Sequence, residues 1–212
     1  PSKDKRTIWN DYTILNSYSS EEAQAKISFI KKFTQTVQPK VLLDLGCNKG
    51  FYSELALMNG ARAVIGIDSD PHACNEAFAR SSEKNLQLNV LQMDLTNPSS
   101  YQGWRSKEFQ SLGNRLHADG MIALALLHHF VLGKNIPMAS AIDYLIEQSP
   151  QGIIEFVDKA DMQVQKMLQF REDIFADYTM QDFLDCVNKK AQVIEKKHIG
   201  DNRTLIWYKR IK

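Results

Sequence analysis

The sequence VLLDLGCNKG, from Val41 to Gly50, joins an apolar run to a loop bounded by glycines. The first five residues predict a short buried strand that ends at Gly46. Glycine at both ends of the loop lets the backbone turn tightly and approach a ligand, because no Cβ is in the way. Asn48 between them is one of the few other residues that tolerate a left-handed backbone. Residues 51–59 then have helical spacing up to Gly60, which completes a strand–loop–helix unit.

Strand-like and helix-like segments continue to alternate along the rest of the chain. Further strands are predicted over residues 63–68, 86–91, 120–127, 152–157, 192–197 and 204–210, and further helices over 71–82, 99–116, 138–148, 160–170 and 179–190. Apolar strands separated by helices favour a parallel sheet covered on both faces. The turn signal at residues 200–203 makes the last two strands an antiparallel hairpin. The expected fold is α/β, a doubly wound, mostly parallel seven-stranded sheet with a C-terminal antiparallel hairpin.

Residues 1–38 precede the first strand and are expected to form an N-terminal helical cap. They contain Trp9, Tyr12, Tyr18 and an amphipathic stretch over 21–33. The three aromatic residues either pack inside the cap or line an acceptor pocket. Residues 39–212 are expected to form one compact domain. Since the chain begins with proline instead of methionine, it fits a processed protein or a fragment of a longer one.

The composition is that of a globular protein and disfavours several other classes. Lys and Arg number 26 against 25 Asp and Glu, so the net charge of +1 gives no sign of a nucleic-acid-binding surface. The longest apolar run, Met121 to Leu127, is far shorter than the roughly 18 residues of a membrane span. No secretory signal opens the chain, and three widely spaced cysteines fit a reducing compartment, so a cytoplasmic location is expected. The histidines and cysteines form no compact ligand pattern, so no metal is expected.

Acidic side chains accompany the first three predicted strands. Asp68 ends the second strand, where a carboxylate can accept two hydrogen bonds from a ribose diol. Asp94 follows the third strand and can accept from an adenine amino group, with Met93 or Leu95 packed on the ring. The loop after the strand that contains Asp44 matches neither the dinucleotide pattern G-x-G-x-x-G nor a P-loop. A nucleoside whose other arm is cationic suits this set, and S-adenosylmethionine is such a ligand.

Each of these residues also has a purely structural interpretation. The loop over 41–50 is compatible with a strand-to-helix turn in another kind of α/β protein. Asp68 is one of several residues that could cap the helix beginning at Pro71. Asp94 lies in a loop after a strand, where aspartate is common.

Taken together, these segments resemble the class I S-adenosylmethionine-dependent methyltransferases. VLLDLGCNKG at 41–50, VIGID at 64–68 and MDL at 93–95 carry the resemblance, which covers residues 40–210. The family usually has glycine where Asn48 stands. The resemblance implies a Rossmann-like sheet and a cofactor site that contains Asp44, Gly46, Cys47, Asn48, Gly50, Phe51, Asp68, Ser69, Met93, Asp94, Leu95 and Leu127.

A narrower resemblance lies in the second half of the chain. DGMIALALLHHF at 119–130 and NIP at 135–137 are similar to the nodulation-type (NoeA-like) methyltransferases, as are IEFV at 154–157, REDIF at 171–175 and RTL at 203–205. The acceptors of that subgroup are poorly defined, so this similarity implies relatives more than a substrate. Methyltransferases that act on adenine or glutamine typically have [N/D]-P-P-[Y/F] after the fourth strand. Here LHHF stands at that place, which disfavours those acceptors.

His128 and His129 are the candidate catalytic residues. They are expected at the end of the fourth strand, beside the transferable methyl group. Adjacent residues on a strand point to opposite faces, so at most one should face the acceptor. That histidine could remove a proton from a hydroxyl or an amine; alternatively, one ring packs in the sheet and the other binds backbone. Glu155, late in the fifth strand, either orients an acceptor or is a satisfied buried acid.

The sequence therefore predicts a methyltransferase that uses S-adenosylmethionine, releases S-adenosylhomocysteine and methylates a small-molecule or glycan-type acceptor. One alternative is an RNA or protein methyltransferase, which would have a basic groove near the pocket. Another is a cofactor-binding, methyltransferase-like module within a larger protein. A nicotinamide dehydrogenase is disfavoured by the glycine pattern. Neither a membrane nor a nucleic acid is indicated as a partner.

Overall fold

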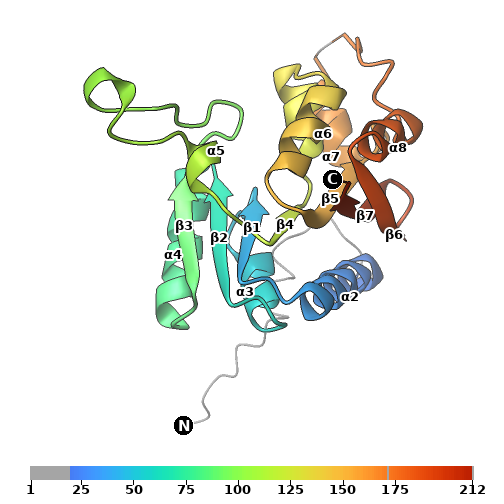
Figure 1. The fold of residues 1–212 in the computed structure, drawn as a ribbon. Helices are drawn as coiled ribbons and strands as arrows, with labels where there is room; N and C mark the ends of the chain where they lie inside the picture. The colour runs from blue at the N-terminus through green and yellow to red at the C-terminus, as the bar shows by residue number, and fades with distance from the viewer. Residues whose placement is uncertain (1–19, 171, 212) are drawn as a thin grey trace.

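Seven strands form a single sheet in the computed structural model, which describes residues 20–170 and 172–211 (Figure 1). The strands are β1 (Val41–Leu45), β2 (Ala63–Asp68), β3 (Leu88–Gln92), β4 (Gly120–Ala123), β5 (Gln151–Val157), β6 (Ala191–Ile199) and β7 (Arg203–Arg210). Their order is β3-β2-β1-β4-β5-β7-β6. The first five strands run parallel, and β7 is antiparallel to both β5 and β6. The predicted doubly wound sheet with a terminal hairpin is confirmed.

Helices cover both faces of the sheet (Figure 1). They are α2 (Ser20–Val37), α3 (Phe51–Leu57), α4 (Pro71–Glu83), α5 (Leu112–Arg115), α6 (Met138–Glu147), α7 (Met162–Leu168) and α8 (Met180–Asn188). Phe33 of α2 and Leu55 of α3 belong to one buried cluster. Leu145 of α6 and Phe183 of α8 belong to a second cluster. The two clusters form the core on opposite faces of the sheet.

The central strand β1 shows why these segments are apolar at successive positions. Leu42 packs into the cluster that contains α2 and α3, whereas Leu43 and Leu45 pack into the cluster that contains α6 and α8. All three are almost fully buried. A fully buried leucine stabilises a fold by about 1.5–3 kcal/mol relative to an exposed one. Because both faces of the sheet are buried, leucine is favoured at adjacent positions of the strand and not only at alternate ones.

The strand order reverses between β1 and β4, and this reversal positions the site. From β1 the chain continues outward through β2 to β3, while β4 lies on the other side of β1. The loops that follow β1 and β4 therefore leave in different directions. In open parallel sheets, ligands bind in the crevice that such a divergence leaves at the carboxyl ends of the strands.

The N-terminal segment is described only from residue 20 onward. Its helix α2 packs on the sheet beside α3 through Ile27, Ile30 and other apolar residues. Trp9, Tyr12 and Tyr18 of the predicted cap lie outside the described residues. The division into a cap and a domain stays a prediction. Within the described residues, no helix combines the length and the apolar character that crossing a membrane requires.

The predicted helix over 99–116 is wrong. The segment contains a short 3-10 turn at Trp104–Ser106, the four-residue α5, and an antiparallel bridge between Gln102 and Phe109. Gly103 has a φ of 82°, and the backbone at Arg105 is also left-handed, so the helical hydrogen-bond pattern cannot continue. Trp104 and Phe109 are exposed, so burial of these two side chains does not stabilise a helix here. The segment projects away from the sheet (Figure 1).

Candidate active site

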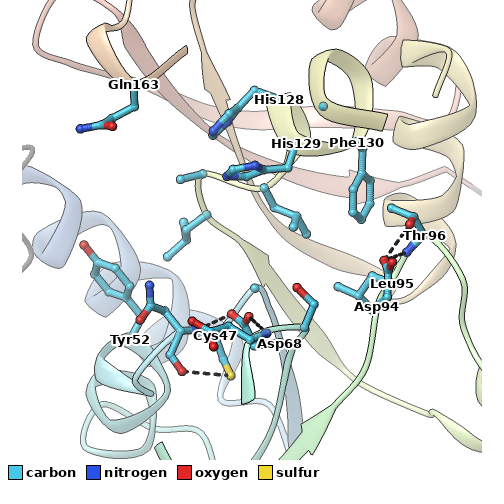
Figure 2. A pocket seen from close by; sticks show the side chains of 18 of the residues that line it. Cys47, Tyr52, Asp68, Asp94, Leu95, Thr96, His128, His129, Phe130 and Gln163 are labelled. Atoms are coloured by element: carbon cyan, nitrogen blue, oxygen red, sulfur yellow. Dashed lines mark hydrogen bonds between the residues drawn. The ribbon is translucent and has the colours of Figure 1, made fainter. Parts of the chain in front are cut away.

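A pocket of about 800 Å³ opens at the carboxyl ends of the central strands. Its wall includes residues 46–49 after β1, residues 68–70 after β2, residues 93–96 after β3 and residues 128–130 after β4. Figure 2 shows His128 and His129 on one side of the pocket, with Cys47 and Asp68 on the other. Further lining side chains come from α2, α7 and β7, namely Lys26, Gln163, Met167 and Arg203. The volume lies within the range of small-molecule and cofactor sites.

The loop after β1 is curled by left-handed residues. The φ angles of Gly46, Asn48 and Gly50 are 77°, 48° and 74°, as the sequence predicted for a tight turn. The backbone N–H groups of Gly46 and Cys47 both donate to the carbonyl of Ile67, at 2.8 and 3.1 Å. This loop is therefore fixed to β2, with Gly46, Cys47 and Asn48 on the pocket wall.

Gly50 has a structural role at the start of α3. A Cβ at this position would stand 3.2 Å from the Cβ of Ala77 and 3.2 Å from Leu88, which is tighter than ordinary contact. Phe51, the next residue, lines the pocket, but Gly50 does not. The glycine therefore allows α3 and α4 to pack closely at the loop.

Asp68 stands at the pocket wall, where the second strand ends. Its Oδ2 accepts a hydrogen bond from the Asn48 N–H at 2.8 Å, and its Oδ1 accepts from the Asp70 N–H at 2.9 Å. The helix cap of α4 is Asp70, whose side chain accepts from the His72 N–H at 2.8 Å. The role of helix cap, which was the structural interpretation of Asp68, is therefore taken by Asp70. Ser69 also lines the pocket.

Asp94 stands on the rim of the pocket after β3. Its Oδ1 accepts from both the backbone N–H and the hydroxyl of Thr96, at 2.8 and 2.7 Å (Figure 2). These hydrogen bonds, with the ammonium of Lys134 at 3.7 Å, hold the pKa of the carboxyl below its usual value. Met93 and Leu95 flank it on the pocket wall. Asp94 is therefore an ionised acceptor beside two apolar side chains.

Two further predicted residues lie behind the pocket wall. Asp44 is buried, its Oδ2 accepts from the Ser53 hydroxyl at 2.6 Å, and burial raises its pKa to about 7. Leu127 is fully buried in the core cluster that contains α6. Neither residue lines the pocket. Their assignment to the cofactor site, like that of the lining residues, stays a prediction.

Both histidines line the pocket, which corrects the expectation that adjacent residues would point to opposite faces. The fourth strand ends at Ala123, earlier than predicted, and Ala125 has a φ of 50°. The chain then enters a π-helical turn, His129–Gly133, with His128 at its N-terminal end. Because neighbouring residues on a helical turn can share a side, the two rings lie with centroids 4.2 Å apart.

His128 is a buried polar side chain in this wall. It is 5% exposed, and its Nδ1 has no hydrogen-bond partner among the described residues. Burial, followed by the charges of His129 and Arg203, lowers the pKa of His128 to about 3. Burial also lowers the pKa of His129. At neutral pH the wall therefore presents an uncharged imidazole, which is a poor general base.

We expect the His128 ring to stay neutral from about pH 8 to about pH 4, because protonation would place a charge in a buried site. NMR spectroscopy of histidine-labelled protein measures this directly. Since the ordinary pKa is 6.5 and the folded value is about 3, unfolding takes up a proton between these limits. The contribution of His128 to stability is thus fully present above about pH 6.5 and declines as the pH falls toward 3. A titration midpoint near 6.5 would contradict the burial of this ring.

A buried ionic network was missed by sequence reasoning. Lys26 Nζ lies 2.6 Å from Glu155 Oε2, with both side chains almost fully buried. Arg203 Nη1 lies 3.6 Å from Glu155 Oε1, and Arg203 Nε donates to Asp161 at 2.8 Å. The detectable signal is the placement of Lys26 on the apolar stripe of α2, three residues after Ala23 and four before Ile30. A lysine on such a stripe needs a buried partner, which the sequence alone does not identify.

Comparison with protein families matches one model to most of the chain. The model of the FtsJ-like methyltransferases covers residues 21–189. Nodulation protein NoeA of Rhizobium meliloti (strain 1021) is 40% identical over 207 residues, which are 97% of this chain. They are 44% of NoeA, so the chain spans less than half the length of that relative.

Solved structures share the fold at low sequence identity. The N-methyltransferase NodS from Bradyrhizobium japonicum WM9 has a TM-score of 0.66 at 11% identity and covers 92% of this chain and 99% of its own. Magnesium protoporphyrin IX methyltransferase (ChlM) from Synechocystis PCC 6803, solved with bound SAM, has a TM-score of 0.64 at 14% identity and covers 100% of this chain and 87% of its own. These likenesses show a shared architecture.

Proposed function

Because the chain belongs to the FtsJ-like methyltransferase family, we propose that its pocket binds S-adenosylmethionine and that the domain methylates a small-molecule or glycan-type acceptor. The observation that carries the proposal is the convergence of three loops on one pocket. The lining residues 46–49, Phe51, Asp68 and 93–95 come from the ends of three neighbouring strands. ChlM, which has the same fold, was solved with bound SAM.

The pocket residues have the hydrogen-bonding capacity that the nucleoside needs. An ionised carboxylate offers about four acceptor positions. Asp68 uses two of the positions for the N–H groups of Asn48 and Asp70, so the others suit two ribose hydroxyls. Asp94 is an acceptor for an adenine amino group, and Met93 and Leu95 supply apolar contact for its ring.

Methyl transfer places few demands on protein side chains. When bound, S-adenosylmethionine supplies a methyl group already activated on a sulfonium. The residues of this chain bind and align the two reactants and exclude water from between them. His128 lines the pocket as a neutral imidazole, and its ring orients an acceptor hydroxyl or amine through a hydrogen bond.

The charges near the histidines support an uncharged acceptor. Four cationic side chains line the pocket, and each has a carboxylate partner. Lys26 and Arg203 are paired with the buried Glu155 and Asp161, while Lys49 and Lys134 are paired with Glu76 and Asp94 nearer the surface. An anionic acceptor would therefore have to compete with an existing ion pair. An uncharged hydroxyl needs only hydrogen-bonding groups, which favours a polyol or sugar-like molecule.

Calorimetric titration of the protein with S-adenosylmethionine and S-adenosylhomocysteine tests the cofactor, with NAD as the control. We expect both methionine-derived ligands to bind and NAD not to, because the glycine loop lacks the dinucleotide pattern. Binding of NAD alone, or of none of the three, would contradict the proposal. Label transfer from methyl-labelled cofactor to a panel of neutral polyols, anionic sugars and RNA then tests the acceptor. Methylation of RNA alone would overturn the acceptor class.

A further inference from the structure

The side chain of Glu155 joins four parts of the chain at one buried point. Its Oε2 accepts hydrogen bonds from Lys26 Nζ at 2.6 Å and from the Ala125 N–H at 2.7 Å. Its Oε1 lies 3.6 Å from Arg203 Nη1. Glu155 itself is 0% exposed and does not line the pocket. The carboxylate thus links α2, β5, β7 and the segment after β4.

The hydrogen bond to the Ala125 N–H occurs where the backbone has an unfavourable conformation. Ala125 has a φ of 50°, a left-handed conformation that the Cβ of alanine makes unfavourable. Immediately afterwards the carbonyl of Leu126 accepts from the His129 N–H at 2.9 Å, and the π-helical turn begins. The left-handed residue therefore separates the straight course of β4 from the turn that carries both histidines.

The same network reaches the wall formed by α7. Arg203 Nε donates to Asp161 Oδ2 at 2.8 Å, and Asp161 Oδ1 accepts from the Gln163 N–H at 2.9 Å as the N-cap of α7. Gln163 lines the pocket near His128 (Figure 2). Two walls of the pocket are therefore attached to one buried set of charges.

We propose that Glu155 is a positioning residue of the acceptor side of the pocket. By accepting from the Ala125 N–H, its carboxylate holds the left-handed turn that places His128 and His129 on the wall. The importance of these rings for methyl transfer rests on the proposed function, but their placement does not. Since Glu155 does not itself line the pocket and reaches it through partners such as Ala125, Lys26 and Arg203, it acts on the reactants indirectly.

Two matched double variants separate the hydrogen bond from the charges. Lys26→Met/Glu155→Gln and Lys26→Met/Glu155→Met both remove the ion pair, but only glutamine retains an oxygen that can accept from Ala125. NMR spectroscopy of histidine-labelled protein reports the ring environments of His128 and His129. We expect the glutamine variant to keep the wild-type ring resonances and the methionine variant to shift them. Adding Ala125→Gly to the methionine variant should restore them, because glycine adopts a positive φ without support.

A measurement on the unmodified protein covers the case in which the methionine variant does not fold. The Ala125 amide proton should exchange slowly with solvent and resonate downfield, as expected of a buried N–H bonded to a carboxylate. Rapid exchange of this amide, or wild-type histidine resonances in the folded methionine variant, would overturn the proposal. Calorimetry with S-adenosylhomocysteine on the same samples tests the cofactor assignment separately from the positioning role of Glu155. Failure of the wild type to bind contradicts the cofactor assignment, whereas the histidine resonances still decide the role of Glu155.

Discussion

Replacing Lys26 with methionine is expected to lower the free energy of unfolding by about 3 kcal/mol, the order found when one partner of a buried ion pair is removed. The Lys26 and Glu155 side chains are 2% and 0% exposed, and their charged atoms are 2.6 Å apart. Methionine preserves most of the side-chain length, so the loss comes mainly from the carboxylate left behind. Arg203 and the Ala125 N–H still contact that carboxylate. The expected loss of stability is therefore at the lower end of the roughly 3–5 kcal/mol found for such changes. Urea unfolding followed by circular dichroism measures the change.

Lys32→Met is the matched control for this prediction. Lys32 is on the same helix and pairs with Glu195 at 2.7 Å, but the two side chains are 59% and 31% exposed. An exposed pair contributes at most about 1 kcal/mol, because water already stabilises both charges. Equal stability of the two single variants would refute a distinct role for the buried pair. Adding Glu155→Gln to Lys26→Met should recover part of the loss, because the buried charge that lost its lysine partner is removed.

The sheet was predictable because burial on both faces leaves a simple pattern in the sequence. Strands such as 41–45 and 120–123 have apolar residues on both faces, and turn residues separate them from the helices. The terminal hairpin was predictable from its turn signal at 200–203. The class I methyltransferase resemblance and its narrower NoeA-like form are confirmed by the match to the FtsJ-like family and by the identity to NoeA.

The sequence-based predictions that were wrong concern segments whose conformation depends on contacts remote in sequence or on unusual backbone angles. Residues 99–116 have helix-compatible residue types, yet left-handed residues at 103 and 105 break the helical path. The strand predicted up to Leu127 stops at Ala123, because Ala125 is left-handed and bonded to Glu155, thirty positions away. Alanine gives no sequence signal for a positive φ, so the shared orientation of the two histidines was not predictable.

The candidate site divides in a similar way. Residues of the loop after β1, together with Asp68 and Asp94, were identifiable because each follows a strand whose carboxyl end reaches the same edge of the sheet. Lys26 and Arg203 were not identifiable in this way, because neither follows a parallel strand: α2 precedes the first strand, and β7 runs antiparallel to its neighbours. Only the packed sheet brings these two side chains to the pocket.

Asp68→Ala is expected to weaken the binding of S-adenosylhomocysteine by about tenfold or more. The reason is the loss of hydrogen bonds from the ribose diol to an ionised carboxylate, since hydrogen bonds to charged groups contribute about 1.5–3 kcal/mol and about 1.4 kcal/mol corresponds to tenfold in Kd. The variant also removes the acceptor of the Asn48 N–H. This loosens the loop that forms the pocket wall beside the ligand. Calorimetric titration of the variant measures the affinity, and circular dichroism verifies that the variant is folded.

Asp119→Ala is a control that matches the chemistry of Asp68→Ala: Asp68 anchors the loop after β1, whereas Asp119 anchors the residues at the start of β1. Asp119 Oδ2 accepts from the backbone N–H groups of Lys40 and Val41 at 2.9 and 3.1 Å, at the start of β1. Like Asp68, it is a carboxylate that accepts from two backbone amides, but it does not line the pocket. We therefore expect its removal to lower stability without changing affinity. If both variants bind as the wild type does, Asp68 is a loop anchor and the ribose site lies elsewhere in the pocket. If only Asp68→Ala loses affinity, the loss is specific to the pocket and arises from the ligand contact together with the loop that Asp68 anchors.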